Sequence, residues 1–203
     1  WWGKAKMALE YALYRTGPLT MAPSQLGAFL KSDPAQATPN LEFHVQPLSL
    51  EKFGDPLHPF PAFTASVCNL RPASRGHIRI KSPDPRASPA IMLNYLSAPE
   101  DQAIAIQSLR LARRVVLGTQ AMKKYAPEEF LPGPGFQTDE ELVKAAGNVG
   151  TTIFHPVGTC RMGRADDASA VVDPQLRVRG IEGLRVIDAS IMPTITSGNT
   201  NSP

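Results

Sequence analysis

The chain has 203 residues, of which 42% are apolar and 19% are charged, and its formal net charge is +3. This composition supports a substantial buried core in one or two domains and excludes a disordered tail. The basic residues are scattered, which argues against a nucleic-acid-binding or membrane-surface stripe, and no apolar run of about eighteen residues that would span a bilayer is present.

The cysteines and histidines do not form a metal-binding pattern. Cys68 and Cys160 lie far apart, which leaves open a disulfide or, more simply, two reduced thiols in a cytoplasmic protein. His44, His58 and His77 do not cluster with cysteines or carboxylates at zinc-site spacing. No signal peptide is evident, but the chain begins with Trp1 rather than methionine, which leaves room for an upstream segment.

The first half of the chain predicts one helix and several strands. Residues 2–15 form a helical pattern that ends at Gly17-Pro18, and residues 33–39 are typical of an exposed loop. Residues 41–46 alternate apolar and polar side chains and predict a half-buried strand, with His44 on its polar face. Residues 63–70 predict a second strand.

A further pair of strands is predicted at residues 76–81 and 90–95, separated by a proline-rich turn. The succession of strands indicates an antiparallel sheet with one face toward water. Residues 53–61 are rich in proline and aromatic side chains and predict a loop, which we place at the border of a substrate entrance.

The hydrophobic period then changes to that of helices. Ser97 and Glu100 match a capping box for a structural helix that ends at Gly118. Thr138 and Glu141 match a second capping box, for a shorter helix that closes at Gly147 and leads the chain toward residue 155.

The candidate chemistry begins with His155. Pro156 fixes one backbone angle beside it, and Gly158 and Gly163 permit turns and the close approach of a bulky ligand. A histidine held in this way can take a proton from an alcohol or return it, because imidazole titrates near neutrality. The alternative is a core histidine that is satisfied by a backbone carbonyl.

A second candidate segment follows about thirty residues later. Residues 184–187 predict a short buried strand that ends in Asp188-Ala189-Ser190, and strand ends of this kind meet nucleotide ligands in α/β sheets. Residues 196–203 are polar and predict a helix start whose free N–H groups suit an anion or an electron-rich ring edge. An ordinary strand, turn and helix cap is the alternative.

The order of the motifs, more than any one of them, resembles the glucose-methanol-choline (GMC) oxidoreductases, most closely their choline dehydrogenase-like alcohol dehydrogenase branch. The resemblance covers the chain well from about residue 71 to residue 203. It is carried by His-Pro-Val-Gly-Thr-Cys-Arg-Met-Gly at 155–163, Val-Val-Asp-Pro at 171–174, Leu-Arg-Val-Arg-Gly at 176–180, Gly-Leu-Arg-Val-Ile-Asp-Ala-Ser at 183–190 and Ser-Gly-Asn-Thr-Asn at 197–201.

The resemblance implies FAD as the cofactor, which accepts a hydride at N5 from the carbon of an alcohol. His155 matches the proton-handling histidine of the family, and Asn199 matches a second position at which some members carry histidine. Because an amide can donate a hydrogen bond but cannot relay a proton, His155 is expected to be the sole acid or base of the pair. The positions that match flavin-lining residues are Phe154, Asp188, Ala189, Asn201 and Ser202.

The same resemblance implies an α+β fold. We expect an antiparallel substrate-domain sheet with flanking helices at residues 1–175 and a return segment of a Rossmann-like FAD-binding domain at residues 176–203. The Gly-x-Gly-x-x-Gly turn that holds the FAD pyrophosphate does not occur in the sequence. The chain is therefore expected to be the C-terminal portion of a larger two-domain enzyme, without its first half and last helix and inactive alone.

The predicted function is oxidation of a choline-like or other primary alcohol to an aldehyde, with His155 as proton acceptor. The substrate is a small-molecule alcohol, and the choice among quinone, dye and oxygen as electron acceptor stays open, as do the oligomeric state and membrane association of the whole enzyme. Phe53, Phe60 and Phe63 fit either a cation-binding surround or the core. The alternatives are a hydroxynitrile lyase of the same fold, a sugar or aryl-alcohol oxidase, and a binding module without cofactor.

Overall fold

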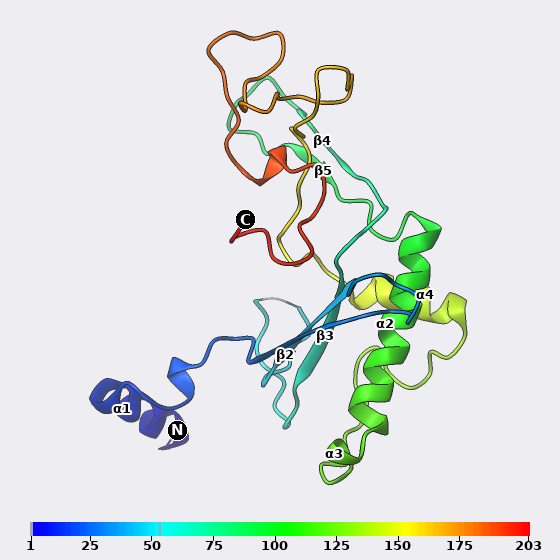
Figure 1. Cartoon of the computed structure of the whole chain (residues 1–203). Coiled ribbons are helices and arrows are strands. Elements are labelled where there is room, and N and C mark those ends of the chain that lie inside the picture. Colours follow the sequence, from blue (N-terminus) through cyan, green and yellow to red (C-terminus); the bar gives the residue numbers. More distant parts are fainter. Residues whose placement is uncertain (1, 53) are drawn as a thin grey trace.

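A three-stranded antiparallel sheet forms the centre of the protein in the computed structural model, which describes residues 2–52 and 54–203. Its strand order is β1-β2-β3, and α2 packs against β3 and against α4 (Figure 1). A separate two-stranded ribbon pairs β4 with β5. The predicted α+β fold with an antiparallel sheet and flanking helices is confirmed.

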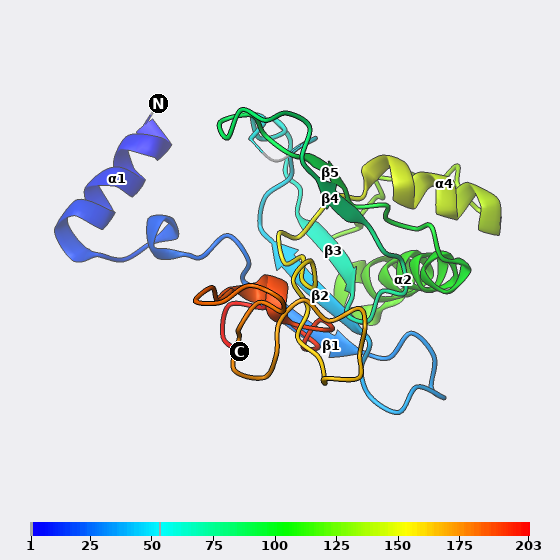
Figure 2. The same cartoon turned by 90° about the horizontal axis from the view of Figure 1, so that it is seen from above.

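The elements alternate along the chain and are joined by long irregular segments. The helices and strands are α1 (Trp2–Tyr14), β1 (Leu26–Leu30), β2 (Leu41–Gln46), β3 (Thr64–Asn69), β4 (His77–Arg79), β5 (Ala90–Met92), α2 (Pro99–Gly118), α3 (Gln120–Lys123) and α4 (Asp139–Val149), with 3₁₀ turns η1 (Pro18–Thr20) and η2 (Ala189–Ile191). Both views show α1 at one end of the molecule, apart from the sheet (Figures 1 and 2).

The two faces of the sheet differ in chemistry because side chains alternate along β2. Leu41 and Phe43 are buried on one face, and Leu41 is paired in register with Asn69. Asn69 donates a hydrogen bond to Asp101 in the first turn of α2, so this face is the one that α2 covers. Glu42 and His44 consequently lie on the opposite face.

The predicted half-buried character of β2 is wrong on its polar face. Glu42 is only 8% exposed, and its side chain lines a cavity together with residues from the C-terminal segment. The C-terminal segment, which is drawn in red in Figure 1, therefore covers a face that the alternating sequence pattern assigns to water. One antiparallel sheet was predicted, but the strands form two: β1 joins β2 and β3, while β4 and β5 pair separately.

The residues before α2 are held by a buried carboxylate. Asp101, which is 5% exposed, accepts hydrogen bonds from the Asn69 side chain and from the backbone N–H groups of Ala73 and Ser74. The predicted capping box of Ser97 and Glu100 is wrong, because the N-cap is Ala98 and has no side-chain cap. Its N–H instead donates to the Ser74 hydroxyl at 3.1 Å.

The capping box of α4 is confirmed. The Thr138 hydroxyl accepts a hydrogen bond from the Glu141 N–H, and the Glu141 carboxylate accepts one from the Thr138 N–H. The helix continues to Val149, past the predicted end at Gly147, because the Gly150 N–H still bonds to the Ala146 carbonyl at 2.8 Å. Leu142 and Ala145 are the buried residues of this helix.

The segment after α4 is irregular over most of its length. The predicted buried strand at 184–187 is wrong, since only a single bridge pairs Arg185 with Arg177 and Ile187 is 74% exposed. Hydrogen bonds between loops hold the segment instead, including Cys160 N–H to the Ser190 carbonyl and Arg179 to the Gly163 carbonyl. In the described part of the chain, no helix is long and apolar enough to cross a bilayer.

We expect Asp101→Ala to lower the free energy of unfolding by about 2 kcal/mol, because it removes a buried carboxylate that accepts three hydrogen bonds. Chemical denaturation followed by circular dichroism measures the change. Asp84→Ala, which removes a more exposed carboxylate from a local turn, is the matched control and should cost clearly less stability. Equal losses in the two variants would contradict the role of Asp101.

The stabilisation by Asp101 should depend on pH. Burial by itself raises the pKa of this carboxyl group, but hydrogen bonds from Ser74 and Ala73 and the charge of Arg75 outweigh it, so the pKa lies below the ordinary 3.8. The contribution is therefore fully present above pH 3.8 and is lost as the pH falls through the lower pKa of the folded state. The stability difference between the parent and Asp101→Asn should shrink in that window.

Candidate active site

His155 is presented by a tightly turned segment that follows α4. The Phe154 N–H donates to the Thr152 hydroxyl at 3.0 Å, and Phe154 has a φ of 66°, in the left-handed region. Gly158 has a φ of 90°, which a residue with a Cβ adopts only with strain. A Cβ on Gly163 would lie 2.7 Å from the Ala170 Cβ, so this glycine allows close packing within the chain, and the predicted close approach of a ligand stays a prediction.

The imidazole of His155 is fastened to the C-terminal segment through Thr200. Its Nδ1 lies 3.1 Å from the Thr200 hydroxyl and also accepts a hydrogen bond from the Thr200 N–H at 3.3 Å. With the Thr200 N–H as donor, Nδ1 is unprotonated; in the other tautomer Nδ1–H donates to the hydroxyl oxygen, and Nε2 is then the unprotonated nitrogen. Nε2 is left as the nitrogen that can meet a ligand.

The loop that carries Thr200 is also hydrogen-bonded to residues that flank the central sheet. Arg71, just after β3, donates to the Ser197 hydroxyl at 2.7 Å and to the Thr38 hydroxyl at 3.2 Å. Ser197 has a φ of 67°. Three segments that are distant in the sequence therefore meet around the two predicted catalytic residues.

His155 and Asn199 line one small cavity of about 40 Å³, so the structure brings together the two residues for which a catalytic role is predicted. A cavity of this size holds a water molecule or a small polar group. The other lining residues come from β2, from β3 and its following residue, and from the two flanking loops: Glu42, Cys68, Asn69, Leu70, Ile153, Ile195 and Gly198.

The five residues predicted to line a flavin lie outside this cavity. Phe154 is 65% exposed beside His155, and Asn201 and Ser202 are exposed beyond Thr200. The Asp188 carboxylate accepts a hydrogen bond from the Ser190 N–H at 2.8 Å, and its hydrogen bonds with the Ser190 side chain and backbone lower its pKa. Ala189 follows at the start of η2.

These residues fit a flat aromatic cofactor by the chemistry that they offer. Ala189 and Gly198 are small, which permits close approach of a ring. In the described part of the chain no hydrogen bond from the Ala189 N–H is found, so this donor is available to an electron-rich ring edge. The Asp188 carboxylate is engaged with its own turn, so a cofactor would meet the backbone there.

Sequence reasoning missed Glu42, Cys68 and Thr200. Glu42 and His44 are two residues apart and therefore lie on the same face of β2. This spacing was the available signal for Glu42, but an alternating pattern predicts that its polar face is exposed to water. Cys68 is paired in register with Glu42 across the sheet. Burial, together with the negative charge of Glu42, raises the pKa of the Cys68 thiol to about 11, so the thiol stays protonated at neutral pH.

The aromatic loop before β3 contributes to a different part of the molecule. The ring of His58 stacks on Phe60 with centroids 5.1 Å apart, and Phe130 packs edge-on against both. Phe60 and Phe63 do not line the His155 cavity, and Phe53 lies outside the described residues. That this loop borders a substrate entrance stays a prediction.

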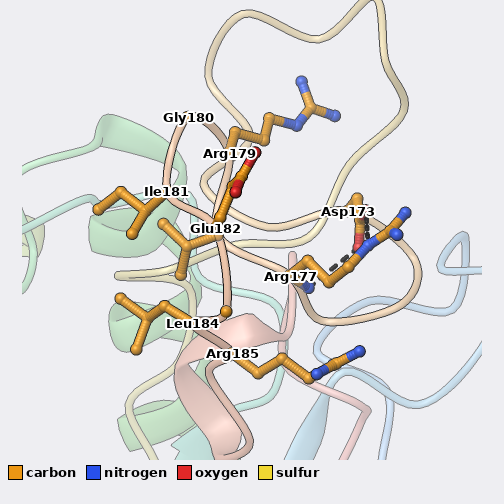
Figure 3. A pocket seen from close by; sticks show the side chains of 10 residues that line it. Asp173, Arg177, Arg179, Gly180, Ile181, Glu182, Leu184 and Arg185 are labelled. Atoms are coloured by element: carbon orange, nitrogen blue, oxygen red, sulfur yellow. Dashed lines mark hydrogen bonds and ion pairs between the residues drawn. The ribbon is translucent and has the colours of Figure 1, made fainter.

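A larger hollow of about 560 Å³ lies along residues 173–185 and contains none of the predicted site residues. Figure 3 shows Arg177 directed toward the Asp173 carboxylate, with which it forms an ion pair at 2.8 Å. The hollow is formed by one exposed loop, so the smaller cavity with its imidazole and carboxylate is the candidate active site. Among the described residues, no group of three or more potential ligands would hold a metal ion.

Comparison with known proteins shows what this chain is similar to. The family model described as GMC oxidoreductase matches residues 72–203. An alcohol dehydrogenase [acceptor] of Pseudomonas putida is 42% identical over 194 residues, which are 96% of this chain and 35% of the relative. Oxygen-dependent choline dehydrogenase 1 of Chromohalobacter salexigens is 38% identical over 203 residues, which are 100% of this chain and 36% of the relative.

A solved structure gives the same result for the fold. Pyridoxine 4-oxidase from Mesorbium loti superposes with a TM-score of 0.75 and 28% identity, over 87% of this chain and 35% of that chain. The chain thus spans just over a third of the length of the curated relatives that it matches.

The reactivity of the Cys68 thiol should depend on the negative charge of Glu42. We expect alkylation of Cys68 by iodoacetamide to be slow at pH 8 and to rise as the pH approaches 11, since only the thiolate reacts. Glu42→Gln removes the negative charge that raises the thiol pKa, so alkylation should accelerate at pH 9. Mass spectrometry of the Cys68 peptide, with Cys160 as internal reference, measures both rates; an unchanged Cys68 rate in Glu42→Gln would contradict the assignment.

Proposed function

Because the chain belongs to the GMC oxidoreductase family, we propose that the complete protein is an FAD-dependent oxidoreductase that converts the CH-OH group of an alcohol to a carbonyl group. The observation that supports the proposal is the cavity that both His155 and Asn199 line, since an imidazole can act as an acid or base and an amide can donate a hydrogen bond. The similarity of the curated alcohol and choline dehydrogenases supports the reaction class.

The residues of this chain have distinct roles in the proposal. Phe154, Ala189, Asn201, Ser202 and the backbone at Asp188 would hold the cofactor. FAD, when bound, supplies a hydride acceptor at N5 for the alcohol carbon. His155 accepts the hydroxyl proton at Nε2 in the tautomer whose Nδ1–H donates to the Thr200 hydroxyl oxygen. The Asn199 amide donates a hydrogen bond to the oxygen as negative charge develops there.

The Thr200 hydroxyl has a supporting role in proton transfer. In this tautomer the Thr200 oxygen already accepts from Nδ1–H, and it continues to do so once His155 has taken the proton and both ring nitrogens are donors. The imidazole then keeps its orientation before and after the transfer. Orientation of this kind lowers the entropic part of the barrier, because the acceptor is already aligned with the substrate hydroxyl.

The finer assignments are part of the same proposal. The substrate is a choline-like or other primary alcohol, the electron acceptor is a quinone, a dye or oxygen, and the protein acts in the cytoplasm. Residues 1–175 belong to a substrate-binding domain, and residues 176–203 return to the FAD-binding domain. The fragment alone is inactive, since the pyrophosphate-binding turn does not lie within it.

His155→Ala in the complete enzyme should lower the rate of flavin reduction about a hundredfold or more, because the proton acceptor is lost. Asn199→Ala should lower it by a similar or smaller factor. Anaerobic stopped-flow bleaching of the flavin absorbance by an alcohol measures the rates, and a lyase reaction on a cyanohydrin would leave the absorbance unchanged. A parental rate in His155→Ala would show that this residue is not the proton acceptor.

Thr200→Val removes the hydroxyl while keeping the side-chain shape, and we expect it to slow flavin reduction about tenfold because the imidazole loses its partner. Thr200→Ser retains the hydroxyl and is the matched control, so it should restore most of the rate. The proposal for Thr200 fails if the valine and serine variants reduce the flavin equally fast.

A further inference from the structure

Arg71 connects the segment that carries Asn199 and Thr200 with the rest of the protein. The Nη2 of its guanidinium group donates a hydrogen bond to the Ser197 hydroxyl at 2.7 Å, over a sequence separation of 126 residues. The same Nη2 donates to the Thr38 hydroxyl at 3.2 Å, in the loop between β1 and β2. This nitrogen has two hydrogens, so it can donate one to each hydroxyl group.

The backbone that carries Arg71 is itself fixed. Its N–H donates to the side-chain oxygen of Asn69 at 2.9 Å, and the Asn69 amide group donates in turn to the Asp101 carboxylate at 3.1 Å. The N–H of Leu70, one residue earlier, donates to the Asn40 carbonyl at 2.9 Å. Because Leu70, Asp101 and Asn40 are all buried, the guanidinium group extends from an anchored part of the protein.

Residues 193–199, by contrast, have almost nothing else to hold them. Among the described residues, the contact with Arg71 is the one hydrogen bond that this segment makes. Ser197 has a φ of 67°, a left-handed conformation that is strained for a residue with a Cβ. Gly198 follows, and glycine adopts many backbone conformations at low cost. Without the Arg71 contact, the backbone at Ser197 can relax and redirect the residues after it.

A change of direction at Ser197 would reach both candidate catalytic residues. Asn199 lies two residues further on and lines the cavity with His155. Thr200 comes next, and its hydroxyl lies 3.1 Å from the Nδ1 of His155. Proton acceptance and the hydrogen bond to the substrate oxygen both need close alignment, since a misplacement of about 1 Å can lower a rate about a hundredfold.

We propose that Arg71 is a positioning residue for the oxidation. It holds Ser197 in the left-handed conformation and thereby sets the Asn199 amide and, through Thr200, the His155 imidazole. The inference rests on the proposed function and adds a residue that acts through Ser197 rather than by contact with the substrate. Arginine suits this task because its guanidinium group is planar, permanently charged and rich in donors.

Arg71→Ala and Ser197→Ala in the complete holoenzyme test the proposal, because each removes one partner of the same hydrogen bond. Ser197→Ala keeps the Cβ and therefore the backbone strain. We expect each variant to lower the rate constant of flavin reduction at saturating alcohol about tenfold. The alcohol concentration that gives half of this rate should change less than about threefold, because alignment acts mainly on the chemical step. Stopped-flow bleaching of the flavin measures both quantities.

Two double variants separate positioning from a general loss of stability. Arg71→Ala with Ser197→Ala should be no slower than either single variant, because both substitutions break one contact. Arg71→Ala should also have a smaller effect in the Asn199→Ala background, where the amide that it positions is already absent. Effects that multiply in both double variants would overturn the proposal.

Arg75→Ala is the matched control. Arg75 is another exposed arginine of the same loop, and its guanidinium group donates to the carbonyl groups of Pro72 and Ser74. In the described part of the chain it makes no hydrogen bond to the C-terminal segment. Its variant should reduce the flavin within about twofold of the parental rate. Equal slowing in Arg71→Ala and Arg75→Ala would contradict the positioning role.

The outcomes distinguish this inference from the proposed function. If Arg71→Ala does not fold, Ser197→Ala decides alone, since it removes only a hydroxyl group, and a parental rate in it overturns the role of Arg71. Unchanged rates in both variants, with a parent enzyme that an alcohol does reduce, leave the proposed oxidation standing. A parent enzyme whose flavin no alcohol bleaches overturns the proposed function and this inference together.

Discussion

The contact between His155 and Thr200 is the interaction on which the site depends. It joins a turned loop after α4 to a segment 45 residues further along the chain, neither of which forms regular secondary structure there. Without hydrogen bonds of this kind, two irregular segments would have no fixed relation to each other. Arg71 adds a second link by bonding to Ser197, and backbone hydrogen bonds such as that from the Cys160 N–H to the Ser190 carbonyl join the same two parts of the chain.

The sheet gives these loops a rigid support. One of its faces packs against α2, and the other lines the His155 cavity. Leu41 and Phe43 are buried on the face toward α2, where the hydrophobic effect stabilises the fold. Glu42 faces the cavity on the other side, where it carries charge into the wall of the site. Because one strand provides both faces, a substitution in β2 falls either on the face toward α2 or on the face toward the cavity, depending only on its register.

The regular elements were largely predictable and the site geometry was not. The spans of α1, β2 and β3 were close to those observed, and the Thr138 and Glu141 capping box was confirmed, because each depends on neighbouring residues. The strand predicted at 184–187 failed because its short apolar run has only a single bridging partner. Ser97 failed as a cap because the Ser74 hydroxyl and the buried Asp101 carboxylate organise the start of α2 instead.

The sequence by itself determined the family, since the order of the motifs around His155 and Asn199 is a linear property that needs no coordinates. It also determined the types of chemical group available, an imidazole and an amide. Only the tertiary structure decided which other groups meet them, because Glu42, Cys68 and Thr200 are brought to His155 by long-range folding. Burial and electrostatic coupling depend on distance in space, and a covered polar strand face has the same sequence pattern as a wet one.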